Sequence, residues 1–282
     1  MPVPDERTGL KAVADWLRVR SLNAALRQQK LYGSLERLRT IIPDISHQYS
    51  SYALDTELLE LETRALHAFQ MQLVEVAVNR AQHGGGQQLT LVDIGDSSGA
   101  HIRYVKAMHG EIRALSVNVD AEAVTKIRAA GLEAVLARAE QVDQFDIRPD
   151  LVLCFETLEH LPDPAQFLRA VATIASVRVL AISVPFVRTS RVGLRYIRRS
   201  LPAVASPETT HVFELAPQDW RPLFMFSGWA IEHEAILKLY PKWHPMTFTM
   251  PLWRKVDYEG FYGAVLRPDP TWQRQHAQGL GT

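Results

Sequence analysis

The stretch that decides the fold is Leu91-Val92-Asp93-Ile94-Gly95-Asp96-Ser97-Ser98-Gly99, in which an apolar strand runs into a turn between two glycines. Gly95 allows the backbone to approach a ligand closely, and Gly99 allows the next helix to pack near the strand. In an open parallel sheet, ligands bind beyond the carboxyl ends of the strands. This turn is therefore the first candidate for a cofactor site, although the same glycines also suit an ordinary strand-to-helix turn.

Short apolar strands and amphipathic helices alternate after this turn. We expect strands at 89–94, 112–120, 132–136, 150–155 and 177–184, with helices from the turn to Lys106 and at 121–130 and 164–175. This alternation predicts parallel βαβ units with helices on both faces of the sheet. A helix at 218–226 and strands at 229–237 and 261–266 complete the pattern. The predicted fold is α/β, a doubly wound, Rossmann-like, seven-stranded and mostly parallel sheet with an N-terminal helical extension.

The chain divides into one large domain with extensions. A long helix of apolar periodicity from Asp55 to Ala81 ends at His83-Gly84-Gly85-Gly86, a strong stop signal. We expect a helical extension or lid at residues 1–55, the α/β domain at 56–267 and a tail at 268–282. Within the domain, residues 188–211 form a basic insertion. The N-terminal helices suit a lid, simple packing or a homo-oligomer contact equally well.

Composition narrows the class of protein. Lys+Arg and Asp+Glu number 31 each, so no overall charge favours nucleic acid or a membrane surface. The lone cysteine, Cys154, suits a reducing compartment. The longest apolar runs are too short to span a bilayer, and the N-terminus lacks the apolar core of a signal peptide. We expect a soluble, cytoplasmic protein.

The glycine turn also carries a resemblance. Asp93-Ile94-Gly95-x-x-x-Gly99, followed by a strand ending in Asp120, resembles the S-adenosylmethionine (SAM)-binding pattern of class I methyltransferases. Residues 150–164 resemble their fourth-strand motif, and the resemblance covers about residues 89–266. It implies SAM as cofactor, held at the methionine end by Gly95 and its turn, at the ribose by Asp120, at the adenine by Glu140 and near the sulfonium by Phe155. The expected cofactor-binding residues are Asp93, Gly95, Asp96, Ser97, Gly99, Asp120, Glu140 and Phe155.

Asp96 departs from that pattern, which often has small residues after the first glycine. Its carboxylate suits either a contact with the SAM amino group or a cap on the following helix, and the cap is slightly favoured. An NAD-binding domain is disfavoured because the Gly-x-Gly-x-x-Gly fingerprint is absent.

A second cluster suggests a metal. Glu156, Glu159 and His160 are spaced so that a helical turn would gather them on one face, and His211 lies in a later connection at the same edge of the sheet. Glu-x-x-Glu-His with a later histidine is similar to the metal site of small-RNA 2′-O-methyltransferases and ubiquinone-pathway O-methyltransferases. It implies a divalent cation, Mg²⁺ or Mn²⁺, on Glu156, Glu159, His160 and His211, with catalytic roles for Glu156, His160 and His211. The alternative is that the acidic residues only favour a helix start.

The acceptor is expected beside the basic insertion. Arg188, Arg191 and Arg195 belong to a cluster of five arginines, whose guanidinium groups suit an anionic acceptor or, alternatively, a solvated helix face. We predict an O-methyltransferase for a polyhydroxylated small molecule, with a saccharide or glycan terminus favoured. A phenol or catechol, or the 2′-hydroxyl of RNA, is the alternative acceptor, although nucleic acid is disfavoured by the neutral charge. A non-catalytic SAM-binding scaffold is the alternative of another class.

Overall fold

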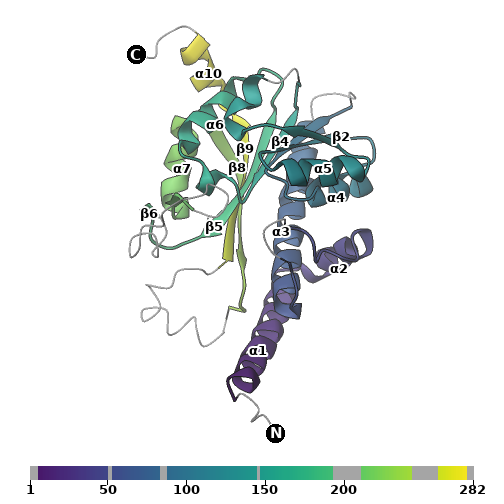
Figure 1. Cartoon of the computed structure of the whole chain (residues 1–282). Coiled ribbons are helices and arrows are strands. Elements are labelled where there is room, and N and C mark those ends of the chain that lie inside the picture. The colour runs from purple at the N-terminus through teal and green to yellow at the C-terminus, as the bar shows by residue number, and fades with distance from the viewer. Residues whose placement is uncertain are drawn as a thin grey trace, which may run out of the picture.

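The computed structural model describes residues 6–49, 53–82, 88–144, 147–192, 211–242 and 260–277. A seven-stranded sheet lies at its centre in the order β3-β2-β1-β4-β5-β9-β8 (Figure 1). The first five strands are parallel, and β9 is antiparallel to both β5 and β8. The strands are β1 (Thr90–Ile94), β2 (Arg113–Asn118), β3 (Glu133–Leu136), β4 (Leu151–Phe155), β5 (Val179–Phe186), β8 (Trp229–Lys238) and β9 (Gly260–Pro268). The predicted fold class is confirmed.

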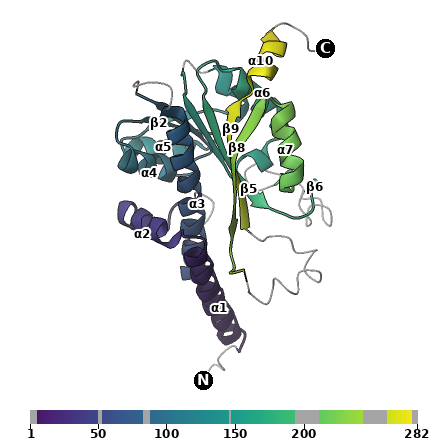
Figure 2. The same cartoon turned by 180° about the vertical axis from the view of Figure 1, so that it is seen from behind.

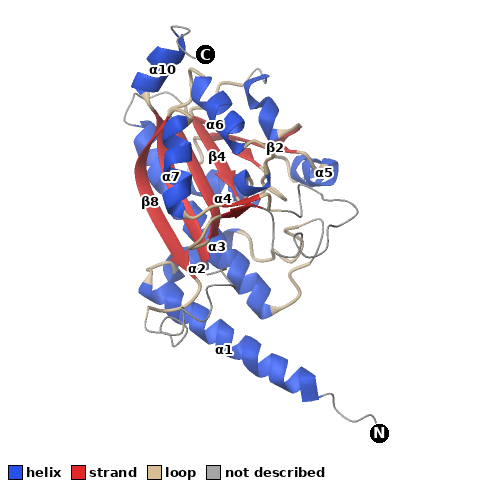
Figure 3. Cartoon of the chain, turned by 90° about the vertical axis from the view of Figure 1, so that its left-hand side faces the viewer, coloured by secondary structure: helices blue, strands red, loops and turns tan. Residues whose placement is uncertain are grey.

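Two layers of helices cover the sheet (Figure 3). The helices are α1 (Glu6–Gln28), α2 (Tyr32–Ile41), α3 (Glu57–Gln82), α4 (Ala100–Met108), α5 (Ala121–Ala129), α6 (Pro164–Thr173), α7 (Pro217–Phe226) and α10 (Pro270–Ala277). Alternating residues of β1 pack against different helix layers, since neighbouring side chains of a strand point to opposite faces. Leu91 is buried in the cluster that contains Phe69 of α3, whereas Val92 is buried in the cluster that contains Phe167 of α6.

Local sequence explains where the helices begin. Pro164 occupies the first turn of α6, and the side chain of Asp163 accepts a hydrogen bond from the Gln166 N–H (2.8 Å), which confirms the cap predicted there. The strand expected at 112–120 ends earlier, at Asn118, because Asp120 caps α5 through the Glu122 N–H (2.8 Å). A two-stranded ribbon, β6 (Arg191–Val192) with β7 (Phe213–Glu214), lies outside the main sheet.

The N-terminal helices extend from one end of the sheet, opposite the C-terminus (Figures 1 and 2). They are anchored to α3 by Arg64, whose side chain is fully buried and donates to the carbonyls of Ile42 (2.9 Å) and Pro43 (2.6 Å). The segment that follows α2 then reaches the glycine turn, where the Ser98 hydroxyl donates to the Gln48 side chain (2.8 Å). In the part of the chain that the structure describes, no helix combines the length and apolar character needed to cross a bilayer.

Candidate active site

A cavity of about 430 Å³ opens at the carboxyl ends of β1, β2 and β4. Many of the residues predicted from the sequence line it: Gly95, Ser97, Asp120, Glu140, Phe155, Glu156, His160 and His211. Gln48 and Tyr49 from the N-terminal segment line it as well. One cavity therefore connects the glycine turn with the two histidines, which come from distant parts of the sequence.

The glycine turn is shaped by a close contact with the end of β4. Gly95 has φ +90°, and a Cβ there would lie 2.2 Å from Oγ1 of Thr157. The Thr157 hydroxyl lies within hydrogen-bond distance of the carbonyls of Ile94 (3.1 Å) and Phe155 (3.0 Å), so it joins the ends of the two strands. Position 95 therefore needs glycine both for its backbone conformation and for space. Gly99 also has a positive φ, +80°, where α4 begins.

Asp93 and Asp96 do not line the cavity, contrary to the expectation that they contact the cofactor. Both side chains are fully buried behind the turn. Asp93 shares the face of β1 with Leu91, so its carboxylate points into the layer of α3 and α4, where it accepts from Nδ1 of His101 (2.9 Å). Asp96 faces the backbone N–H groups of His101 and Ile102, each at 3.4 Å, which matches the capping interpretation. Burial, together with nearby Asp93, raises the pKa of Asp96 to about 6.

A buried polar network, which the sequence pattern did not predict, lies beside these acids. Nε2 of His101 lies 2.9 Å from Oε1 of Gln70, and Nε2 of Gln70 donates to the Ser183 hydroxyl (3.0 Å). That hydroxyl in turn donates to Glu156 (2.8 Å). His101 and Gln70 both line the cavity. The only signal in the sequence is polar residues, His67 and Gln70, on the buried face of the long helix α3.

Glu156 lies in this network and outside the histidine cluster. Its φ of +47° is rare for a residue with a side chain, and its N–H donates to the Ser183 carbonyl (2.9 Å). The turn expected to gather it with Glu159 and His160 begins only at Leu158, as a 3₁₀ helix over Leu158–His160. Glu156 precedes that turn and is directed to Ser183. Burial raises the pKa of Glu156 to about 8, although the Ser183 hydrogen bond opposes this shift.

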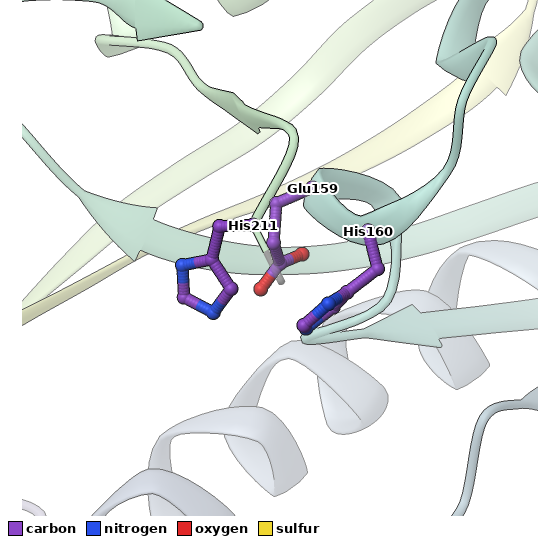
Figure 4. Close-up of side chains that lie close together, drawn as sticks. All are labelled: Glu159, His160 and His211. Atoms are coloured by element: carbon purple, nitrogen blue, oxygen red, sulfur yellow. The ribbon is translucent and has the colours of Figure 1, made fainter. Parts of the chain in front are cut away.

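Glu159, His160 and His211 do come together (Figure 4). One ligand atom from each lies within 4.8 Å of the others, and the two imidazole rings meet edge to face with centroids 4.7 Å apart. The Val212 N–H donates to the Glu159 carbonyl (2.8 Å), which brings the later segment to the turn. Nδ1 of His211 is hydrogen-bonded to Glu214 (3.0 Å), and this contact orients the ring.

The Glu159 carboxylate is the most unusual group of this cluster. It is fully buried, and neither of its oxygens has a hydrogen-bond partner among the residues that the structure describes. Burial, followed by the charge of Glu156, raises the pKa of Glu159 well above its ordinary range. An unpartnered buried carboxylate is costly, so this group requires a proton or a cation.

The arginines proposed for the acceptor are not gathered at the cavity. Arg188 is exposed and does not line it. Arg191 forms an ion pair with Glu214, so its guanidinium already has a carboxylate partner. Arg195 lies outside the described residues.

Comparisons with known proteins agree with this fold. Residues 92–178 match the family described as a methyltransferase domain. The chain thus has the fold of class I SAM-dependent methyltransferases, as the resemblance implied, and the family match lies at the centre of the sheet domain. A curated relative is the ubiquinone biosynthesis O-methyltransferase of Pseudoalteromonas translucida (strain TAC 125), 27% identical over 122 residues. That match covers 42% of this chain and 51% of the relative, so it spans about half the length of the relative.

Solved structures show the same fold at low sequence identity. A protein from Galdieria sulphuraria, inferred to be a sarcosine dimethylglycine methyltransferase, has a TM-score of 0.55 at 14% identity and covers 84% of this chain and 98% of its own. The magnesium protoporphyrin IX methyltransferase of Synechocystis PCC 6803, solved with S-adenosylhomocysteine (SAH), has a TM-score of 0.51 at 13% identity and covers 86% and 98%. The [4+2]-cyclase SpnF has a TM-score of 0.52 at 13% identity and covers 87% and 97%. Because a cyclase shares the fold, the reaction has to be argued from the site.

Proposed function

We propose that this protein is a SAM-dependent O-methyltransferase that transfers the methyl group to a hydroxyl presented beside His160 and His211. The observation that carries the proposal is the single cavity that runs from Gly95 and Asp120 to these two histidines. We call the part of the cavity at Gly95 and Asp120 the cofactor end and the part at His160 and His211 the reactive end. The two ends must share one cavity if a methyl group is to pass from the cofactor to the acceptor.

The cofactor end offers the contacts that SAM requires. Gly95 lines the cavity where the methionine portion would lie, and the contact with Thr157 leaves no space for a side chain at this position. Asp120 and Glu140 both line the cavity, where Asp120 would accept a hydrogen bond from a ribose hydroxyl and Glu140 would face the adenine. Phe155, at the end of β4, gives an aromatic contact for the sulfonium.

The reactive end supplies a base. Methyl transfer needs the acceptor oxygen, the methyl carbon and the sulfur in line, and the hydroxyl proton must be taken up as the C–O bond forms. His160 and His211 both line the cavity and are partly buried, so either ring can accept this proton when no metal is bound. Glu214 holds His211 through Nδ1, which leaves Nε2 to face the acceptor.

A divalent cation fits the same group of side chains. The unpartnered carboxylate of Glu159 and the rings of His160 and His211 form a mixed oxygen and nitrogen donor set, which suits Mn²⁺ and is acceptable to Mg²⁺. A bound cation would lower the pKa of a coordinated hydroxyl and so make it a better nucleophile. The proposed ligands are Glu159, His160 and His211, since Glu156 is directed to Ser183.

The acceptor we favour is a small molecule with adjacent hydroxyls, such as a saccharide or glycan terminus. A phenol or catechol is the second candidate, and the similarity to the ubiquinone biosynthesis O-methyltransferase supports it. RNA is disfavoured because Lys+Arg and Asp+Glu balance at 31 each. Exposed Arg188 offers an anionic acceptor one cationic contact outside the cavity.

An acceptor panel tests the proposal. Transfer of the labelled methyl group of SAM would be measured to sugars with adjacent hydroxyls, to catechols and to a short RNA, each with Mn²⁺ and with EDTA. Transfer to a diol that is lost in EDTA and in His211→Asn supports the proposal. SAM binding without transfer to any acceptor would instead support the scaffold alternative.

A further inference from the structure

His101 lies between two hydrogen-bond acceptors in the wall of the cavity. Its Nδ1 is 2.9 Å from an Asp93 oxygen and its Nε2 is 2.9 Å from the Gln70 carbonyl oxygen. A ring nitrogen that faces an acceptor must carry a hydrogen, so with the Gln70 amide in this orientation both ring nitrogens are protonated. The geometry therefore describes a buried imidazolium.

The same side chains also suit the neutral ring. If the Gln70 amide turned over, its NH₂ group would donate to Nε2 of His101 and its carbonyl would accept from the Ser183 hydroxyl. That hydroxyl donates to Glu156 in the observed arrangement. A rotation of one amide and one hydroxyl thus leaves His101 fully hydrogen-bonded in either charge state, which makes the network a two-state element.

Several titratable groups face His101. Asp93 and Asp96 lie on the side of β1 and its turn, Glu156 follows β4, and His67 of α3 has its ring centroid 5.2 Å away. Arg64 and Tyr104 lie beyond His67. Burial opposes the charge on His101, but the three acids outweigh it and raise the pKa of His101 above 6.5. Burial lowers the pKa of His67 well below its ordinary value, whereas the acids raise that of His101, so His101 is the one of these two rings that favours the charged form.

The cofactor would bring a positive charge close to this ring. His101 lines the cavity, and its ring lies 5.3 Å from that of Phe155, the residue proposed to contact the sulfonium. Two positive charges repel strongly in a buried site, where water screens them little. SAM carries the sulfonium charge, whereas its product SAH has a neutral thioether at the same atom.

We propose that His101 is a charge-responsive residue of the cofactor site, which loses its second ring proton when the sulfonium of SAM is bound and regains a proton when methyl transfer leaves neutral SAH. This inference rests on the proposed function, because it needs SAM in the cavity. Without this proton uptake, methyl transfer would remove one positive charge from a site that faces three acidic side chains, Asp93, Asp96 and Glu156. A residue with this behaviour holds SAM and SAH with the same total charge in the cavity.

Atoms and charge balance in this step. An oxygen lone pair of the acceptor forms the C–O bond, and the C–S bond breaks with its electron pair going to sulfur. The hydroxyl releases one proton to the base, the base passes this proton to solvent, and His101 takes up one proton from solvent. The positive charge that leaves sulfur thus reappears on the imidazole, and the complex has the same net charge before and after transfer.

Binding calorimetry of SAM and SAH tests the inference. Both cofactors would be titrated into the whole protein between pH 5.5 and 7.5, in buffers of different ionisation enthalpy. SAM binding should release about 0.3 to 1 proton, and SAM affinity should fall by up to about tenfold per pH unit as the pH is lowered. SAH binding should release none, because it brings no charge to His101.

Variants test whether the proton released on SAM binding comes from the His101 ring. His101→Asn keeps a donor for Asp93 but does not titrate, so the difference between SAM and SAH should disappear. His233→Asn, at an exposed histidine of β8, should keep it. Gln70→Glu places a carboxylate at Nε2 and should weaken SAM binding at pH 7 by about tenfold while changing SAH binding little. This variant and the wild-type proton count remain informative if His101→Asn does not fold.

The outcomes separate the two proposals. Failure of SAM to bind at any pH would overturn the proposed function and this inference with it. SAM binding with the same proton count as SAH, or a difference that persists in His101→Asn, would overturn only the role of His101.

Discussion

The rings of His160 and His211 meet edge to face with 4.7 Å between their centroids, although one follows β4 and the other precedes β7. The Val212 N–H fixes this approach by donating to the carbonyl of Glu159 (2.8 Å). The buried Glu159 carboxylate is thereby held beside two imidazoles.

Removing the Glu159 charge should abolish metal-dependent stabilisation. We expect Mn²⁺ to raise the Tm of the wild-type protein and to leave Glu159→Gln unchanged, because the amide replaces the one anionic ligand of the cluster. Thermal unfolding with and without saturating Mn²⁺ measures this. Glu111→Gln, at an exposed carboxyl, is the control and should respond like the wild type. An equal metal response in both variants would remove Glu159 from the site.

Glu159 should also make stability depend on pH when metal is removed. The pKa of Glu159 is raised in the folded protein above its ordinary value of 4.5. The stability that the protonated group contributes is then fully present below pH 4.5 and is lost as the pH rises through the folded pKa. In EDTA, the wild-type protein should therefore lose stability relative to Glu159→Gln as the pH rises above 4.5. The difference in the free energy of unfolding should grow by at most about 1.4 kcal/mol per pH unit. Urea titrations from pH 4 to 8 measure this difference. A difference in the free energy of unfolding that stays constant with pH would refute the prediction.

Gly95→Ala should reduce the stability of the protein by more than backbone strain alone would. Gly131 is the matched control, since it also has a positive φ (+75°) but has no atom within 4 Å of an added Cβ. We expect Gly131→Ala to cost about 1 kcal/mol of stability, from strain only. Gly95→Ala should cost about 2–4 kcal/mol, because the methyl group also meets Thr157, and it should abolish SAM binding. Urea unfolding compares them, and equal losses would show that the contact with Thr157 is easily relieved.

Arg64→Met should detach the N-terminal segment from the cofactor site. The change leaves the carbonyls of Ile42 and Pro43 without their buried donor, at a cost of about 2–4 kcal/mol. SAM affinity should fall as well, because Gln48 and Tyr49 of this segment line the cavity. Unfolding and SAM titration measure the two effects. Arg39→Met, which breaks the exposed pair with Glu36, should change stability by less than about 0.5 kcal/mol. A stable Arg64→Met protein with normal SAM affinity would contradict this role.

The sequence predicted the sheet well because each strand and helix carries its own local signal. Short apolar runs located β1, β4 and β5, and the Asp163-Pro164 step located the start of α6. The alternation of side chains along β1 could also have shown that Asp93 shares a face with Leu91 and points away from the cavity. That inference needs only the period of a strand.

The site was predicted less completely because its details depend on distant contacts. The left-handed backbone of Glu156 follows from its two hydrogen bonds to Ser183, which no local pattern reveals. The pairing of Arg191 with Glu214 depends on the β6–β7 ribbon. The link between His101 and Gln70 joins α4 to α3 and has no signature of its own.

SAM binding to wild type, Asp120→Asn and Asp120→Ala is the most direct test of the central claim that this cavity is a SAM site. Asparagine keeps the cap on α5 but lacks the charge, whereas alanine loses both. Calorimetry should show micromolar binding by the wild type and binding at least about tenfold weaker in both variants, with only Asp120→Ala losing about 1 kcal/mol of stability. Absence of SAM binding by the folded wild-type protein, with and without Mn²⁺, would contradict the account.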